Sequence, residues 1–348
     1  MASISKKQTA PSPAAHRKTR KTNKVNLHAS RNDEITVVGI GASAGGLKAL
    51  EEFFQALPGS TGMAFVVITH LHPEHESHMA ELLQRHTQMP VQQVNGLMSV
   101  ENDHVYVIPP NRRLVMQDSQ IDIAEFKEPR GQRAPVDYFF RSLARGHPNS
   151  VGIILSGGGT DGAVGVKAIK EEGGLLMVQH PDEAEYNSMP TAAIATGLAD
   201  VVLPVRDLAV KLMEFTRFTP PLPLEAEDLT EKQQEMIRRI LAHVHARTGH
   251  DFSQYKRSTL LRRIQRRMQI HVATTLESYF EYLRQNAMEA SALFNDILIG
   301  VTSFFRDREA WGSLGRQVIP EILKKEESSD MVRAWIIGCS TGEEAYGL

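Results

Sequence analysis

Short apolar runs alternate with stretches of helical periodicity between residues 35 and 216. Apolar runs that read as buried strands cover residues 35–40, 63–69, 151–155, 175–178 and 201–203. Helical patterns lie between several of them, at residues 47–56, 78–85, 138–145 and 164–171. This alternation predicts a doubly wound α/β domain over residues 35–216, with a mostly parallel sheet and helices on both faces. Residues 113–116 and 121–125 predict a hairpin that interrupts the order.

The pattern changes after this domain. Residues 217–229 are rich in proline and acidic side chains and read as a linker. Helical periods at residues 231–247, 258–271 and 276–285 predict a small all-α domain over residues 230–293. In the last segment, residues 294–348, a strand-like run at 331–337 leads into the sequence GCSTGEE at 338–344. We expect this run to be the first strand of another α/β unit.

Composition and charge restrict where the protein acts. The 348 residues carry a formal net charge of -2, and Cys339 is the only cysteine, so no intrachain disulfide can form. No apolar run approaches the roughly 20 residues of a membrane-spanning helix, and the N-terminus lacks a signal peptide pattern. We therefore predict a soluble cytoplasmic protein. Residues 1–34 read as a disordered basic tail, and a solvated tail is favoured over one that binds nucleic acid or a membrane.

Candidate catalytic residues follow three of the predicted strands. Ser43 lies in a small-residue loop, GIGASAGG at residues 39–46, between the first strand and the first helix. His70 follows the second long strand, and Asp161 lies in LSGGGTDG at residues 155–162, after another strand. Parallel strands bring their carboxyl ends to one edge, so the three side chains are expected to meet there. Serine, histidine and aspartate together suit a serine hydrolase, in which histidine deprotonates serine and aspartate orients the histidine.

Two other interpretations of these residues remain open. The glycines of residues 39–46 also fit a dinucleotide-binding loop, although the next strand ends at His70 rather than at the acidic residue that such a site uses. His70, His72 and His75 are spaced closely enough to bind zinc, in a pattern similar to that of metallo-β-lactamase-type hydrolases. A zinc hydrolase is therefore the main enzymatic alternative. It would leave Ser43 and Asp161 without a role, and we predict no metal site.

The motifs at residues 39–46 and 155–162, together with THL at 69–71 and Met189-Pro190, resemble those of the chemotaxis protein-glutamate methylesterases, the CheB family. The resemblance implies hydrolysis of glutamyl methyl esters on chemotaxis receptors, and deamidation of receptor glutamines, without a cofactor. By position it implies Ser43 as nucleophile, His70 as general base and acid, and Asp161 as the orienting carboxylate. It implies the backbone N–H groups of Ala44 and Gly158 as oxyanion donors. No receiver pattern precedes residue 35, so we expect control of activity by another route.

The region after the linker resembles a second family, the chemotaxis receptor methyltransferases (CheR). TGHDF at residues 248–252 and LRRIQRRM at 261–268 are similar to its helical N-terminal domain. A helical wheel places Arg262, Arg263 and Arg266 opposite the apolar positions. The resemblance implies that this basic face binds acidic receptor segments.

Two further motifs, VTSFFRD at residues 301–307 and GCSTGEE at 338–344, resemble the S-adenosylmethionine-binding elements of the same methyltransferase family. The resemblance implies Thr302, Arg306 and Glu343 as cofactor contacts. A doubly wound methyltransferase core needs several more strands than this sequence has. We therefore expect a truncated and inactive methyltransferase half in which binding of S-adenosylmethionine is doubtful. A non-catalytic receptor-binding module is the alternative in which this half dominates.

Overall fold

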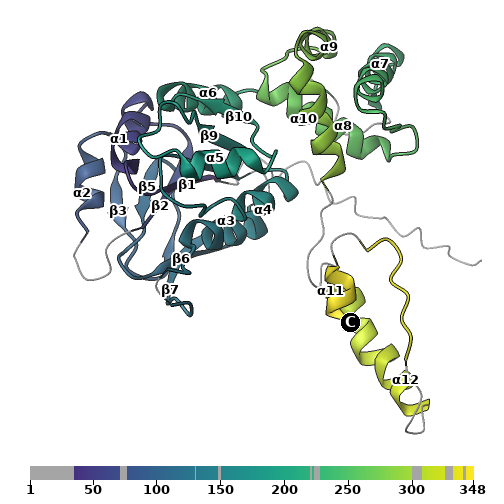
Figure 1. The fold of residues 1–348 in the computed structure, drawn as a ribbon, viewed down its shortest axis with the longest axis horizontal. Helices are drawn as coiled ribbons and strands as arrows, with labels where there is room; N and C mark the ends of the chain where they lie inside the picture. Colours follow the sequence, from purple (N-terminus) through teal and green to yellow (C-terminus); the bar gives the residue numbers. More distant parts are fainter. Residues whose placement is uncertain are drawn as a thin grey trace, which may run out of the picture. The chain divides into compact units, whose positions relative to one another are not determined.

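Parallel strands form the central sheet of the first domain (Figure 1). The computed structural model describes residues 35–70, 77–129, 131–147, 150–219, 222, 228–299, 308–325, 332–339 and 342–348. Across the sheet the order within this described part is β10 (Val201–Leu203), β9 (Leu175–Gln179), β8 (Val151–Ile154), β1 (Thr36–Ala42), β2 (Met63–Thr69), β5 (His104–Val107) and β3 (Val91–Gln93). All neighbouring pairs are parallel. The predicted mostly parallel sheet is confirmed.

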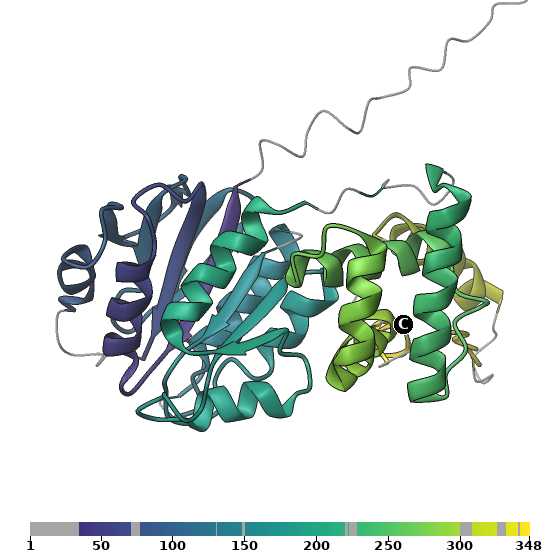
Figure 2. The same ribbon diagram turned by 90° about the horizontal axis from the view of Figure 1, so that it is seen from above.

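Helices cover both faces of this sheet (Figure 2). Two separate apolar cores lie between these helices and the sheet. One core takes side chains from α1 (Gly46–Ala56), α2 (Met79–Gln84) and α6 (Val205–Arg217). The other takes them from α3 (Pro135–Gly146), α4 (Gly165–Glu171) and α5 (Ser188–Ala195). Because both faces are covered, β2 is buried at every position and its sequence is a continuous apolar run rather than an alternating one. The domain is therefore doubly wound, as predicted.

A small antiparallel sheet packs beside α3. Its order is β4 (Met98–Ser99), β7 (Gln120–Ala124) and β6 (Arg113–Gln117). The hairpin of β6 and β7 confirms the predicted one, and Asp118 takes a positive φ of 49° at its turn. The sequence patterns did not predict β3, β4 and β5. These strands have two to four residues each, too few for an apolar period to be recognised.

Four helices make up the second domain, with an apolar core of their own. They are α7 (Glu231–Thr248), α8 (Arg257–Ile270), α9 (Leu276–Gln285) and α10 (Ala287–Leu298). Thr230 and Thr275 begin α7 and α9 with capping boxes, in which the threonine side chain and the third helical residue satisfy each other's backbone N–H. The first three helices were predicted and α10 was not. None of the described helices is long and apolar enough to cross a lipid bilayer.

The last described elements of secondary structure are helices. They are α11 (Arg308–Ser313), the π-helical η2 (Leu314–Val318), α12 (Ile319–Lys325) and α13 (Glu343–Gly347). The prediction of a strand over residues 331–337 is wrong for the described residues 332–337, which form no strand and pair with none. Trp335 is 90% and Ile337 93% exposed. An apolar segment without neighbouring strands cannot satisfy its backbone groups in a sheet, whatever its propensity.

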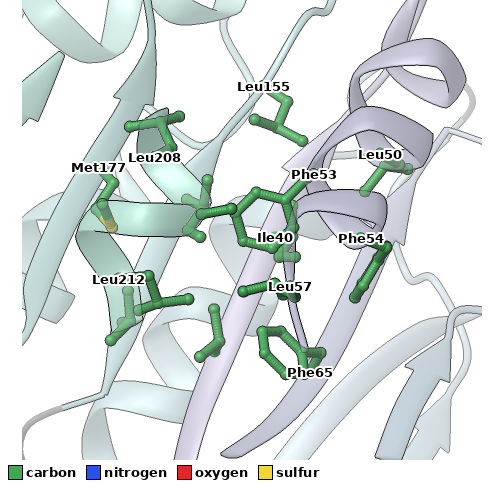
Figure 3. Packing of buried hydrophobic residues seen from close by; sticks show 14 of the residues in the cluster. Ile40, Leu50, Phe53, Phe54, Leu57, Phe65, Leu155, Met177, Leu208 and Leu212 are labelled. Carbon is green, nitrogen blue, oxygen red and sulfur yellow. The ribbon is translucent and has the colours of Figure 1, made fainter. Parts of the chain in front are cut away.

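The packing of α1 on the sheet provides a test of the fold. Phe53 is fully buried and makes edge-on contacts with Phe54 and Phe65, whose ring centroids lie 5.6 and 6.4 Å away (Figure 3). We predict that Phe53→Ala lowers the free energy of unfolding by about 3–5 kcal/mol, because the side chain is lost and a cavity remains. Urea unfolding measures this. Val210→Ala on α6, where the side chain is 53% exposed, should stay within about 0.5 kcal/mol of the wild type. Equal losses in the two variants would contradict the described packing.

Candidate active site

Three chain segments end at one edge of the sheet, around the point where the strand order reverses. From β1 the chain adds β2 and β5 on one side, and later β8, β9 and β10 on the other. Ligands of open α/β sheets bind at such a switch point, beyond the carboxyl ends of the strands. Ser43 follows the last residue of β1, His70 follows the last residue of β2, and Asp161 lies in the loop after β8. The topology therefore brings these three side chains to the same crevice.

The three side chains form a continuous chain of contacts. His70 Nδ1 lies 3.0 Å from Ser43 Oγ, and His70 Nε2 lies 3.0 Å from Asp161 Oδ2. A neutral imidazole protonated at Nε2 therefore donates to Asp161 and can accept the serine proton at Nδ1. The Asp161 side chain is 7% exposed and that of His70 34%, so the carboxylate is buried while the imidazole reaches solvent. This is the geometry of an activated serine nucleophile.

The first turn of α3 holds Asp161 in place. The N–H of Val136 donates to Asp161 Oδ2 and the N–H of Asp137 donates to Asp161 Oδ1, both at 3.0 Å. These donors lack an acceptor inside their own helix, and the helix dipole favours negative charge at this end. The carboxylate is therefore oriented by the backbone on one side and faces the imidazole of His70 on the other.

Asp137 is a second buried carboxylate beside the site. Its Oδ1 accepts the N–H groups of Val164 and Gly165, at 3.0 and 2.6 Å, and so caps the start of α4. Burial raises the pKa of Asp137, the Gly165 N–H opposes this in part, and the neighbouring charge of Asp161 raises it further. Asp137 thus joins the first turns of α3 and α4 around the loop that carries Asp161.

Small residues allow the loop after β8 to approach the nucleophile. A Cβ atom on Gly157 would collide with the sulfur of Met189 and would lie 3.0 Å from Ser43 Cβ. Ser156 adds two links between the loops. Its carbonyl accepts the N–H of Ser43 at 2.9 Å, and its hydroxyl oxygen accepts the N–H of Tyr186 at 3.0 Å. The φ angle of Gly157 is not positive, so its backbone conformation does not require glycine. Glycine is required there because a side chain would collide with Met189.

The expected oxyanion donors remain available. Within the described part of the chain, the N–H groups of Ala44 and Gly158 donate to no backbone or side-chain acceptor. Ala44 is exposed in the loop before α1, and a Cβ on Gly158 would meet no atom within 4 Å. Ala44 directly follows Ser43, and Gly158 directly follows Gly157, whose added Cβ would lie 3.0 Å from Ser43 Cβ. Their role as oxyanion donors stays a prediction.

Of the closely spaced histidines considered for a zinc site, His70 and His78 belong to the described residues. His72 and His75 lie outside the described residues, so this alternative is untested by the geometry. His78, just before α2, is exposed, and its Nδ1 lies 3.1 Å from Glu81 Oε2. His70 itself contacts Ser43 and Asp161.

The predicted basic face of α8 is not a single exposed surface. Arg262 is exposed, Arg266 is half-buried, and Arg263 is only 6% exposed. The expectation that the three arginines share one solvent-facing side is therefore wrong. The helical wheel assumed one buried stripe, whereas α8 contacts neighbouring elements on more than one side.

Of the three predicted contacts for S-adenosylmethionine, only one can be located. Thr302 and Arg306 lie outside the described residues. Glu343 begins α13, directly after Gly342, which has a φ of 105°. The apolar residues before it, at 332–337, are largely exposed. The described residues of this segment therefore do not provide the apolar walls that an adenine ring needs.

The sequence did not predict the structural roles of Asp137 and Ser156 at the site. Asp137 follows Pro135 in the first turn of α3, where an acidic residue is ordinarily a surface helix-start signal. Ser156 lies inside the motif of residues 155–162 but received no role. Their functions depend on contacts between distant segments, which residue spacing does not reveal.

A serine, a histidine and a buried carboxylate in this order of contact, at the carboxyl edge of a doubly wound sheet, define a serine hydrolase. The profile of the CheB methylesterase family matches residues 38–212, and the chain belongs to this family. Two further profiles match later segments. CheR methyltransferase, all-alpha domain, matches residues 235–298, and CheR methyltransferase, SAM binding domain, matches residues 300–348.

The chain is similar to several individual proteins over part of its length. An uncharacterized 104.1 kDa protein in the hypE 3′ region of Rhodobacter capsulatus is 34% identical over 292 residues, which are 78% of this chain and 31% of that protein. Protein-glutamate methylesterase/protein-glutamine glutaminase 2 of Burkholderia lata is 34% identical over 197 residues, 54% of this chain and 55% of that protein. The crystal structure of the Thermotoga maritima CheB methylesterase catalytic domain is similar with 26% identity and a TM-score of 0.49, covering 52% of this chain and 98% of that one. The chain thus spans about a third to a half of the length of the two protein relatives.

The buried carboxylate of Asp137 predicts a change in pH dependence. Its folded-state pKa is raised, so between the unfolded value and the folded value the native state binds more protons, and this group lowers stability as the pH rises. Asp137→Asn keeps an oxygen to cap α4 but removes the charge. Urea unfolding between about pH 4 and pH 7 should show the variant gaining stability relative to the wild type as the pH rises. A difference between the two proteins that is constant over this range would contradict the assigned environment.

Proposed function

We propose that residues 35–216 hydrolyse glutamyl methyl esters on chemotaxis receptors or similar signalling proteins, and that they deamidate receptor glutamines. The observation that carries the proposal is the contact of His70 with both Ser43 Oγ and Asp161 Oδ2, each at 3.0 Å. Membership of the CheB methylesterase family supports the substrate class. The names of relatives such as the Burkholderia lata protein support both activities.

The reaction proceeds in two stages. Ser43 Oγ attacks the ester carbonyl while its proton passes to His70 Nδ1, and the carbonyl oxygen becomes an oxyanion that faces the N–H groups of Ala44 and Gly158. Collapse of this intermediate breaks the bond to the methoxy group, which leaves as methanol with the proton from His70. A water molecule then attacks the acyl-enzyme with His70 again as base, and glutamate and free Ser43 are released. With glutamine the leaving group is ammonia.

Asp161 orients His70 and stabilises its positive charge during both stages. The two N–H donors of α3 fix the carboxylate, so little reorganisation is needed when the imidazolium forms. No cofactor enters this mechanism.

The zinc hydrolase and the non-catalytic module remain the alternatives to this mechanism. A zinc enzyme built on His70, His72 and His75 would require metal for turnover, whereas the serine mechanism does not. A receptor-binding module would release no methanol at all. The two alternatives therefore differ from the proposal in measurable ways.

We predict that Ser43→Ala and His70→Ala each lower turnover by on the order of 10⁶-fold, because each removes a member of a unit that acts together. Asp161→Asn should lose about 10⁴-fold, since it removes the charge that orients the base. Methanol release from a methylated receptor measures all three. Ser60→Ala is the control, because this hydroxyl contacts Asp103 at 3.0 Å in the loop before β2.

Wild-type turnover in the Ser43→Ala variant would overturn the assigned nucleophile. Loss of activity on treatment with a chelator, restored by zinc, would instead identify the histidine cluster as the site. Wild-type protein that releases no methanol under any of these conditions would leave a binding role.

We propose that the segment after α10 does not bind S-adenosylmethionine tightly. Trp335 and Ile337 are almost fully exposed, so they cannot enclose an adenine ring, and no methyl-transfer step is assigned to Glu343. Calorimetric titration of the chain should give a Kd no tighter than about 1 mM, which corresponds to about -4 kcal/mol. Micromolar binding would contradict this proposal, and Glu343→Gln would then show whether Glu343 contributes.

A further inference from the structure

Four buried charged side chains meet where the first domain faces the helical domain. Lys170 of α4 and Asp200, just before β10, come from the first domain, while Arg267 of α8 and Asp296 of α10 come from the second. Their side chains are between 1% and 7% exposed. All four belong to the same compact unit, Ile35–Leu348.

The ion pairs cross between the domains in both directions. Arg267 Nη1 of the helical domain lies 2.9 Å from Asp200 Oδ1 of the first domain. Lys170 Nζ of the first domain lies 2.9 Å from Asp296 Oδ1 of the helical domain, and 2.6 Å from Asp200 Oδ1. Each domain therefore contributes one cation and one anion, and each cation contacts the anion of the other domain.

Further contacts fix the orientation of Arg267 within the helical domain. Its Nε and Nη2 donate to the two oxygens of Glu289 at 2.8 and 2.6 Å, so the guanidinium is held as a fork. Glu289 also accepts from the hydroxyl of Tyr279 at 2.7 Å and contacts His271 Nε2 at 2.8 Å. Burial would raise the pKa of Glu289, but the hydrogen bonds from Arg267 and His271 outweigh it and lower this pKa to about 2.

Contacts within the first domain fix the orientation of the Asp200 carboxylate. Its Oδ2 accepts the N–H of Leu176 at 2.9 Å. Burial would raise the pKa of Asp200, but the positive charges of Lys170 and Arg267 outweigh it and hold the pKa below its usual range. Asp200 and Arg267 are therefore each held by contacts within their own domain as well as by each other, which favours one register of contact over others.

Contacts of α8 with α6 surround the ion pairs. Ile270 belongs to the apolar core that α1 and α6 form with the sheet. The Arg266 guanidinium lies 4.4 Å from the centroid of the Phe215 ring, and Gln269 Nε2 donates to the Phe215 carbonyl at 3.1 Å. Burial lowers the pKa of Arg266 to about 10. This side of α8 is thus a packed surface rather than a solvated one.

We infer that α8 and α10 form a docking surface for the first domain of the same chain, with Arg267–Asp200 and Lys170–Asp296 as its reciprocal ion pairs. Helix α8 serves this contact with Arg266 and Arg267, whereas Arg262 on the same helix is exposed. If the domains separated while folded, Asp200 would lose Arg267 and Asp296 would lose Lys170, and each buried carboxylate would keep only the cation of its own domain. The docked register, in which both crossing pairs form, is therefore favoured over registers in which they are broken. The inference does not depend on the proposed esterase activity.

Hydrogen exchange of the full chain tests this docking across the interface. Lys170→Met removes a charge in the first domain. We expect amides of α8 and α10, in the other domain, to exchange at least about tenfold faster, while those of β1 and β2 stay protected. Lys167→Met is the matched control on the same helix, since Lys167 pairs with Glu171 at 3.4 Å and is 54% exposed. It should leave α8 and α10 at wild-type rates.

A second variant, on the other side of the interface, distinguishes loss of docking from a loosening of the first domain by Lys170→Met. Asp296→Asn lies in the helical domain, and we expect it to speed the exchange of the Leu176 amide and of α4 in the first domain. If Asp296 acted within its own domain alone, the exchange rates of these amides would not change. Wild-type exchange across the interface in both variants, or equal effects of Lys167→Met and Lys170→Met, would overturn the inference.

Discussion

The position of Asp161 depends on a contact between the loop after β8 and the first turn of α3. Two backbone N–H groups of that turn donate to the carboxylate, and its Oδ2 also faces His70. The same turn supplies Asp137, whose carboxylate caps α4. The triad, the loop and two helices are therefore one hydrogen-bonded arrangement. A helix N-terminus is well suited to this, because its free N–H groups need acceptors in any case.

The helix capped by Asp137 also reaches the second domain. Its first turn receives the Asp137 carboxylate, and near its other end Lys170 takes part in the ion pairs with Asp200 and Asp296. α4 therefore borders the catalytic loop at one end and the interdomain contact at the other. Buried ion pairs contribute little net stability because removing charges from water is costly, but they discriminate strongly between aligned and misaligned surfaces. The contact between the domains is accordingly specific.

Much of the first domain could be predicted from its sequence. Long strands buried on both faces give continuous apolar runs, and the structure has strands at all five predicted positions. Short strands such as β4, with two residues, carry too little pattern to be recognised. At residues 332–337 the error is the reverse, because a strand is predicted where the structure has none. The apolar sequence of this segment predicts a strand, but sheet formation needs partners that residue preferences cannot provide.

The sequence by itself determined which residues could perform the chemistry. Ser43, His70 and Asp161 each follow an apolar run, and parallel strands place such residues at one edge whatever the detailed packing. Only the tertiary structure decided the roles of Asp137 and Ser156, and the burial of Arg263 and Arg267 in α8. Local periodicity reports which side of an element is apolar. It does not report which distant charge or N–H group will lie opposite a polar side chain, because that depends on how separate elements pack.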